Sequence, residues 1–313
     1  MPTIPTRRDM LSQSIAAAGL AAMAQTATAA ETSSQQPFAI ALNTSTIRGQ
    51  KLPLAAEIEI AARAGYQGIE PWMNEIDEHV RSGGSAADLR KRCADSGLKV
   101  AGVIAFAEWI VDDDARRAKG LQEAKRVMDL TAEIGGRHIA APPAGVSQAD
   151  ELGTSKIADR YRALIELGET RGVTPQLELW GFAKVLNKLS EVVAVAIETG
   201  HPHACVLADS YHLYKGGSAY ESLRLVSGDA LHVFHINDYP ANPPRAEIND
   251  AARIFPGDGV APLDVIFKAL RGNGFQGMLS LELFNREYWT QDALQVARTG
   301  YEKTRAAIQA SFA

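Results

Sequence analysis

The chain has 313 residues, a formal net charge of −5 and a hydrophobic fraction of 46%. These values are ordinary for a folded protein with a large core, and a mildly acidic chain without a basic tract argues against nucleic-acid binding. No apolar run approaches the ~20 residues that cross a bilayer, so we expect no membrane-spanning segment.

The first residues have the composition of an export leader. Arg7 and Arg8 stand side by side, an alanine-rich apolar stretch follows, and small residues up to Ala29 offer a cleavage site. This order is typical of a twin-arginine signal, which places the mature protein in the periplasm. The alternative, an uncleaved anchor, needs a longer apolar stretch. The predicted divisions are a signal over 1–29, a linker over 30–36 and one domain over 37–313.

After the leader, apolar stretches typical of strands alternate with amphipathic stretches typical of helices. The predicted strands cover residues 38–45, 68–72, 99–106, 138–145, 174–180, 204–212, 231–238 and 278–284. The predicted helices cover residues 52–65, 86–97, 114–135, 152–171, 188–200, 218–226, 262–272 and 290–309.

This alternation predicts a parallel sheet of the α/β class. Eight strand–helix units in about 280 residues match a single (β/α)8, or TIM, barrel. A doubly wound open sheet is the alternative, but it usually has a glycine-rich phosphate turn after its first strand, and "ALNTSTIRG" has none. Cys93 and Cys205 fall on a predicted helix and a predicted strand, and we expect both to be unpaired core residues.

Four predicted strands carry one metal-capable side chain near their carboxyl ends. These are Glu178, Asp209, His235 and Glu282. Active sites of such barrels form at this end, and ionised groups are rare in apolar strands unless they are paired or bind a metal. The inner faces of these strands show no Lys or Arg partner. We therefore predict one divalent ion, with separate structural ion pairs as the alternative. The donor set suits Mn²⁺, Mg²⁺, Co²⁺ or Zn²⁺, with Mn²⁺ preferred because a protein exported after folding acquires its metal in the cytoplasm.

Other side chains at or after strand ends are candidates for substrate contacts. They are Asn43, Glu70, Trp72, Trp180, His212 and Arg253. The two indoles either stack on the C–H face of a sugar or cap the barrel core, and Asn43 and Glu70 are candidates for hydroxyl contacts. His212 follows Asp209 by three residues and is placed to reach substrate or a carboxylate. Arg253 either holds a substrate oxygen or forms a surface salt bridge. The remaining histidines are interpreted as structural or surface residues: His79, His138, His201, His203 and His232.

These residues lie in motifs that resemble a known family. The motifs are "ALNTST", "AGYQGIE", "LELW", "VLADSYH", "FHINDYP", "DAARIFPGDGVAPLD" and "LSLELFNREYW". The chain resembles the xylose-isomerase-like TIM-barrel family of sugar isomerases and epimerases, and within it the inosose isomerases. The resemblance implies that the four metal-capable residues are the metal ligands. It also places the family's Asp-x-x-His on Asp209 and His212, and its substrate-loop arginine on Arg253.

The implied chemistry is the movement of a proton on a keto sugar or keto-polyol. A divalent ion acidifies the C–H between a carbonyl and a hydroxyl, and Glu178 and Glu282 are the candidates that remove and return the proton through a cis-enediolate. One alternative is a lyase similar to dehydroshikimate dehydratase, which uses the same proton abstraction. Another is a non-catalytic exported sugar-binding protein. An endonuclease-IV-like enzyme needs further metal-binding histidines, which the third and fourth strands lack.

Overall fold

A computed structural model describes residues 37–147 and 150–313, and the predicted leader and linker lie outside the described residues. All eight predicted strands are present, although each is shorter than the sequence predicted. The strands are β1 (Ala39–Asn43), β2 (Gly68–Glu70), β3 (Lys99–Val100), β4 (His138–Ala141), β5 (Thr174–Glu178), β6 (Val206–Asp209), β7 (Leu231–Ile236) and β8 (Met278–Leu281).

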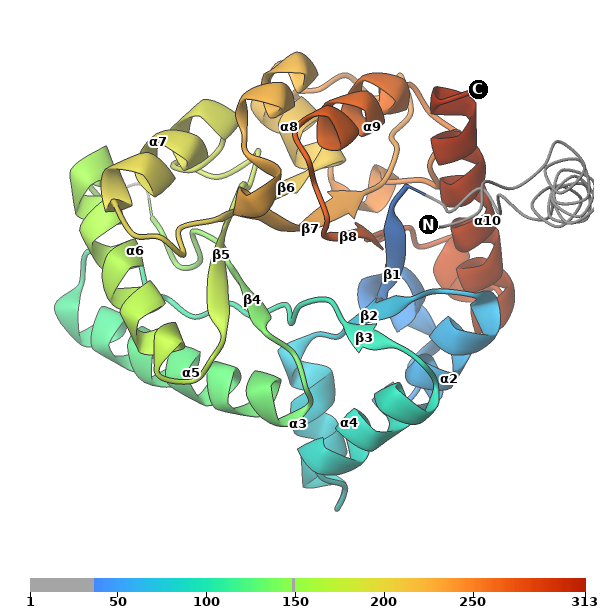
Figure 1. The fold of residues 1–313 in the computed structure, drawn as a ribbon, viewed down its shortest axis with the longest axis horizontal. Coiled ribbons are helices and arrows are strands. Elements are labelled where there is room, and N and C mark those ends of the chain that lie inside the picture. Colours follow the sequence, from blue (N-terminus) through green and yellow to red (C-terminus); the bar gives the residue numbers. More distant parts are fainter. Residues whose placement is uncertain (1–36, 148–149) are drawn as a thin grey trace, which may run out of the picture. The chain divides into compact units, whose positions relative to one another are not determined.

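The strands form one parallel sheet in the order β3-β2-β1-β8-β7-β6-β5-β4. A parallel bridge between Val103 and Ile139 joins the two ends of this order. The Val103 N–H donates to the carbonyl of His138, and the Ala140 N–H donates to the carbonyl of Val103, both at 3.0 Å. The sheet therefore closes on itself, and the predicted (β/α)8 barrel is confirmed (Figure 1).

Helices surround the strands (Figure 1). They are α2 (Leu54–Ala64), α3 (Met73–Arg81), α4 (Ala86–Asp95), α5 (Asp114–Glu133), α6 (Thr154–Glu169), α7 (Leu189–Thr199), α8 (Ser210–Gly216), α9 (Leu263–Gly272) and α10 (Ala293–Ser311). Within the described residues, five 3₁₀ segments lie in connections: Thr44–Gln50, Tyr220–Leu225, Gly228–Ala230, Asp250–Ala252 and Tyr288–Thr290. None of the described helices has the length and apolar character needed to cross a membrane.

The sequence missed α3 and α8, and the helix that it predicted over 218–226 is the 3₁₀ segment Tyr220–Leu225. The predicted strand over 204–212 ends early because its last part begins α8. The carboxylate of Asp209 accepts a hydrogen bond from the His212 N–H at 2.9 Å, which caps the helix. His212 therefore lies in the first turn of α8.

Side chains fill the space inside the strands and the space between the strands and the helices, so the barrel is packed and not a pore. A small cluster occupies the space inside the strands, and it consists of Ala41, Ala101, Ile104, Ala140, Leu207 and Val233. A larger apolar layer lies between strands and helices. Cys93 and Cys205 are buried and free, which confirms that prediction.

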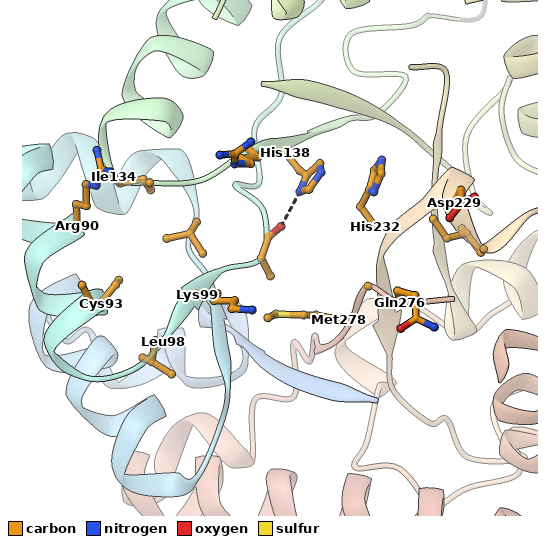
Figure 2. A pocket seen from close by; sticks show the side chains of 18 residues that line it. Arg90, Cys93, Leu98, Lys99, Ile134, His138, Asp229, His232, Gln276 and Met278 are labelled. Carbon is orange, nitrogen blue, oxygen red and sulfur yellow. Dashed lines mark hydrogen bonds between the residues drawn. The ribbon is translucent and has the colours of Figure 1, made fainter. Parts of the chain in front are cut away.

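A cavity of about 580 Å³ opens at the amino ends of the strands (Figure 2). His138 and His232 lie there with stacked rings, their centroids 4.3 Å apart. Burial lowers the pKa of His138 to about 4 and also lowers that of His232. Asp229 is the one carboxylate among the lining residues. The lining of this cavity therefore combines two histidines with a single carboxylate, whereas the sequence predicted three carboxylates and one imidazole at the opposite end.

Candidate active site and metal centre

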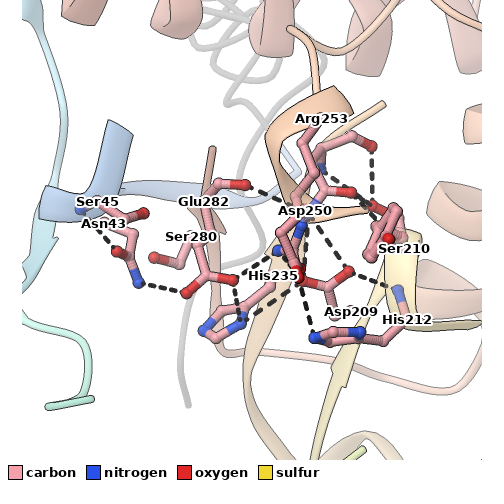
Figure 3. Close-up of polar contacts among 12 residues, drawn as sticks. Asn43, Ser45, Asp209, Ser210, His212, His235, Asp250, Arg253, Ser280 and Glu282 are labelled. Carbon is pink, nitrogen blue, oxygen red and sulfur yellow. Dashed lines mark hydrogen bonds and ion pairs between the residues drawn. The ribbon is translucent and has the colours of Figure 1, made fainter. Parts of the chain in front are cut away.

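The carboxyl ends of three adjacent strands bring an Asp, a His and a Glu together (Figure 3). Asp209 ends β6, His235 lies near the end of β7, and Glu282 directly follows β8. One potential ligand atom from each lies within 4.8 Å of the others, and all three residues are buried. The Nδ1 atom of His235 lies 3.3 Å from Oε2 of Glu282 and 3.8 Å from Oδ2 of Asp209.

The orientation of His235 fits a metal ligand. Its Nε2 lies 3.0 Å from Oε2 of Glu70, and a carboxylate oxygen only accepts, so Nε2 carries the hydrogen and Nδ1 presents its lone pair to the other carboxylates. Buried Nδ1 forms no hydrogen bond with any described residue that satisfies distance and angle together. Burial alone lowers the pKa of His235, but Glu282 and Glu70 outweigh it and raise the pKa well above its usual value. Without a metal, this raised pKa favours a second proton on Nδ1, and a divalent cation would take the place of that proton.

Asn43 and Glu70 support this group from beneath. Asn43 Nδ2 donates to Oε2 of Glu70 at 2.9 Å and to Oε1 of Glu282 at 3.2 Å. Its Oδ1 accepts from the Trp72 indole N–H at 2.9 Å and from the Ser45 N–H at 3.0 Å, which fixes the amide orientation. Neither Asn43 nor Glu70 lines the cavity above. The structure therefore places them behind the metal-capable residues, where their polar atoms bind their neighbours. The hydroxyl contacts expected of them stay a prediction.

Arg253 is a buried cationic partner of these carboxylates. Its guanidinium NH1 donates to Oδ2 of Asp209 at 2.9 Å and to Oε2 of Glu282 at 2.7 Å. Its NH2 donates to Oδ1 of Asp250 at 2.5 Å. The side chain is only 1% exposed, so the alternative of a surface salt bridge is wrong. The inner faces of β5 to β8 hold no Lys or Arg, and this cationic partner comes from the connection after β7. Burial favours a lower pKa for Arg253, but Asp209 and the other carboxylates raise it.

His212 and Arg253 both line the cavity. The Gly181 N–H donates to Nδ1 of His212 at 3.3 Å, and Nε2 lies 3.1 Å from NH2 of Arg253. Burial lowers the pKa of His212 to about 3, so the ring is neutral near pH 7. The structure thus presents a neutral imidazole and a charged guanidinium side by side in the cavity. We call the polar surface around Glu282, Arg253 and His212 the cavity floor.

Glu178 and Glu282 line the same cavity but have different surroundings. Both oxygens of Glu282 accept hydrogen bonds, and although burial raises its pKa, His235 and Arg253 lower it below the usual value. Oε2 of Glu178 is buried without a partner among the described residues. Burial raises the pKa of Glu178 to about 8. Glu178, predicted as the fourth ligand, is not part of the group within 4.8 Å.

The cavity has a volume of about 410 Å³, and Trp72 and Trp180 line it, as expected for residues at these strand ends. A sequence model of the family described as "Xylose isomerase-like TIM barrel" matches residues 58–302. The chain belongs to this family. The resemblance seen in the sequence motifs is therefore confirmed.

The chain is similar to proteins with related but distinct activities. It is 26% identical over 264 residues to an inosose isomerase of Bacillus velezensis, covering 83% of this chain and 93% of that protein. It is 27% identical over 249 residues to a 3-dehydroshikimate dehydratase of Pseudomonas putida, covering 79% of this chain but only 38% of that protein. A crystal structure of the IolI protein with a bound zinc atom superposes with a TM-score of 0.80, at 23% identity, over 88% of this chain and 99% of that one.

Proposed function

We propose that this protein is a divalent-metal-dependent isomerase or epimerase of a keto sugar or keto-polyol. The observation that carries the proposal is the pair of glutamates in one cavity. Arg253 and Asn43 hold Glu282 as an anion, whereas Glu178 has an unpaired buried oxygen that favours its protonated form. Two carboxyl groups whose surroundings separate their pKa values supply a proton acceptor and a proton donor.

Asp209, His235 and Glu282 would hold the metal. The bound ion would polarise the substrate carbonyl and so acidify the adjacent C–H. One nitrogen and several carboxylate oxygens suit Mn²⁺, and also Zn²⁺, Co²⁺ or Mg²⁺. We favour Mn²⁺ because a protein exported after folding through the twin-arginine route acquires its metal in the cytoplasm. We also propose a periplasmic location for the mature protein.

The residues of the chain then divide the work on the substrate. Glu178 and Glu282 remove and return the proton, and the position to which it returns decides between a moved carbonyl and an inverted carbon. Arg253 and neutral His212 lie beside Glu282 and are placed to orient substrate oxygens. The aromatic residues above this floor exclude water, which strengthens the electrostatic interactions beneath them.

A lyase is the second candidate, because the similarity to the dehydratase covers 79% of this chain. Proton removal next to a carbonyl followed by loss of a hydroxyl uses the same glutamate pair. The two functions differ in the product and not in the first step. A non-catalytic sugar-binding protein remains the alternative of a different class.

Solvent exchange distinguishes these functions. Protein loaded with Mn²⁺ is incubated in D₂O with inosose, a free ketohexose or dehydroshikimate, and products are identified by NMR. Deuterium with a moved carbonyl indicates an isomerase, deuterium with an inverted centre an epimerase, and loss of water a lyase. Tight binding of a sugar without exchange on any compound would refute catalysis and favour the binding protein.

Both glutamates are required in this proposal. Glu178→Gln and Glu282→Gln each keep the side-chain volume but remove the proton-transfer group, so each is expected to lower the exchange rate on the order of 10²–10⁴-fold. Glu123→Gln is a matched control, because Glu123 pairs with Arg126 on the outer helix α5. If either active-site variant retains the full rate, the assignment of the pair is wrong.

A further inference from the structure

The wall of the active-site cavity is a continuous arc of aromatic rings. In order around the arc, the rings belong to Phe284, Trp72, Phe106, Trp180 and Phe182. Successive ring centroids lie 5.9, 5.2, 5.9 and 5.2 Å apart. The residues come from the segments that follow β8, β2, β3 and β5, so four separate connections contribute to one apolar surface.

This wall offers almost no hydrogen-bonding capacity to a ligand. The indole N–H of Trp72 already donates to Oδ1 of Asn43 at 2.9 Å. The indole of Trp180 interacts with the Glu178 carboxyl, where it favours the ionised form and so opposes the rise in pKa caused by burial. The polar groups of the cavity are instead on the floor around Glu282 and Arg253, on the segment Asn249–Ala251, and on Arg286, two residues beyond Phe284. A sugar with hydroxyls on every side matches the floor but not the arc.

The outer end of the arc, which we define as Phe106, Trp180 and Phe182, is open to solvent at its two phenylalanines. Phe106 is 44% exposed and Phe182 is 53% exposed, and they are the only aromatic residues among the large exposed hydrophobic side chains of the described chain. An exposed apolar patch at the mouth of a cavity is typical of a ligand-binding surface. The cavity of about 410 Å³ also lies within the roughly 300–1,000 Å³ of sites for larger small molecules.

The position of Phe182 is fixed by the backbone. A Cβ atom at the preceding Gly181 would lie 2.4 Å from the carbonyl oxygen of His212 and 2.6 Å from the nitrogen of Gly216. Glycine therefore allows this segment to lie directly against α8, where the Gly181 N–H binds the His212 ring. The backbone from which the Trp180 and Phe182 side chains extend is thus positioned by its contact with α8.

We propose that the substrate is a keto sugar bearing a flat apolar group, such as an aryl group on a glycosidic oxygen, and that Phe106, Trp180 and Phe182 form the subsite for this group. The inference rests on the proposed function for the sugar part of the ligand. The sugar lies on the polar floor, and the apolar group contacts the outer end of the arc. Burial of aromatic surface on both sides then adds to the affinity.

Binding of unreactive probes tests the subsite separately from catalysis. The Mn²⁺-loaded protein is titrated by calorimetry with phenyl and methyl D-glucopyranosides, in both anomeric forms. We expect at least one phenyl glycoside to bind at least tenfold more tightly than its methyl counterpart. Phe182→Ser and Phe106→Ser should each remove most of this advantage, because the affinity for the phenyl glycoside should fall by a much larger factor than the affinity for the methyl glycoside. Ile197→Ser, on α7 and 73% exposed, is the control for loss of an exposed apolar side chain.

Several results overturn the subsite. Equal affinities for phenyl and methyl glycosides overturn the subsite even if keto sugars are turned over. A phenyl preference that both serine variants retain also overturns it. Phenol binding as tightly as the phenyl glycoside indicates a general apolar surface instead. A dimer that Phe182→Ser dissociates indicates an interface between copies of the chain. A phenyl preference lost in the variants supports the subsite even if no keto sugar reacts, in which case only the proposed reaction fails.

Discussion

Removal of the buried guanidinium should reveal how strongly the site depends on positive charge. Arg253→Met leaves the carboxylates of Asp209 and Glu282 without the NH1 group that now binds both, at 2.9 and 2.7 Å. Both carboxylates are almost completely buried. Loss of one member of a buried ion pair typically costs about 3–5 kcal/mol, because the other charge stays buried and uncompensated. We expect a loss of this size in the free energy of unfolding of the metal-free protein.

A bound metal should reduce the loss. The oxygens that lose Arg253 are the ones that face Nδ1 of His235, so a divalent cation there compensates the same carboxylates. Urea unfolding followed by circular dichroism, with EDTA or with excess Mn²⁺, measures both quantities. The surface variant Arg126→Met is the control, because Arg126 is 42% exposed and its ion pairs contribute about 1 kcal/mol or less. An equal loss for Arg253→Met with and without metal would refute the shared role of these carboxylates, and a loss as small as the control's would refute the buried ion pair.

Three further predictions concern groups outside the reaction itself. Burial raises the pKa of Glu57 to about 9, so the folded chain keeps a proton that the unfolded chain releases above about pH 4.5. The free energy of unfolding should therefore fall as the pH rises between these values, by up to about 1.4 kcal/mol per pH unit. Glu57→Gln should flatten that slope in urea titrations at pH 5 and 8. Glu70→Gln should weaken metal binding roughly 10–100-fold in competition titrations, because Glu70 orients His235. Replacing Arg7 and Arg8 by Lys should leave uncleaved protein in the cytoplasm on cell fractionation.

The barrel could be predicted because its signal is local and repeated. Each strand is an apolar stretch that can be recognised by itself, and the alternation with helices implies parallel pairing. The beginning of α8 could not be separated from β6, because the apolar stretch Val206–Ala208 runs through Asp209 into a helix that contains the large side chain Tyr211. An Asp before a short polar segment is itself an N-cap signal, and it indicates that the strand ends there.

The candidate site was predictable to the extent that strand ends determine it. Asp209, His235 and Glu282 meet because neighbouring parallel strands end at the same rim. The buried ion pairs of Arg253 were not predicted because this residue comes from a long connection, 44 residues after Asp209 in the sequence, and its path back into the barrel is not encoded in any local pattern. The role of Glu70 depends on a contact across the barrel interior with His235. The two residues are 165 positions apart in the sequence, so no local pattern indicates the contact.

The division of the cavity into a polar floor and an apolar wall explains why the family name does not identify the substrate. The floor is built from strand ends, which the barrel holds in fixed relative positions, so relatives that catalyse different reactions can share it. The wall is built from the connections after β2, β3, β5 and β8, whose lengths and residues vary without changing the barrel. In the proposed reaction the floor accounts for a carbonyl, a neighbouring hydroxyl and a proton. The wall with Phe106 and Phe182 faces whatever lies beyond the reacting carbons. A substrate search should therefore vary the group attached to the sugar before it varies the hydroxyls of the ring.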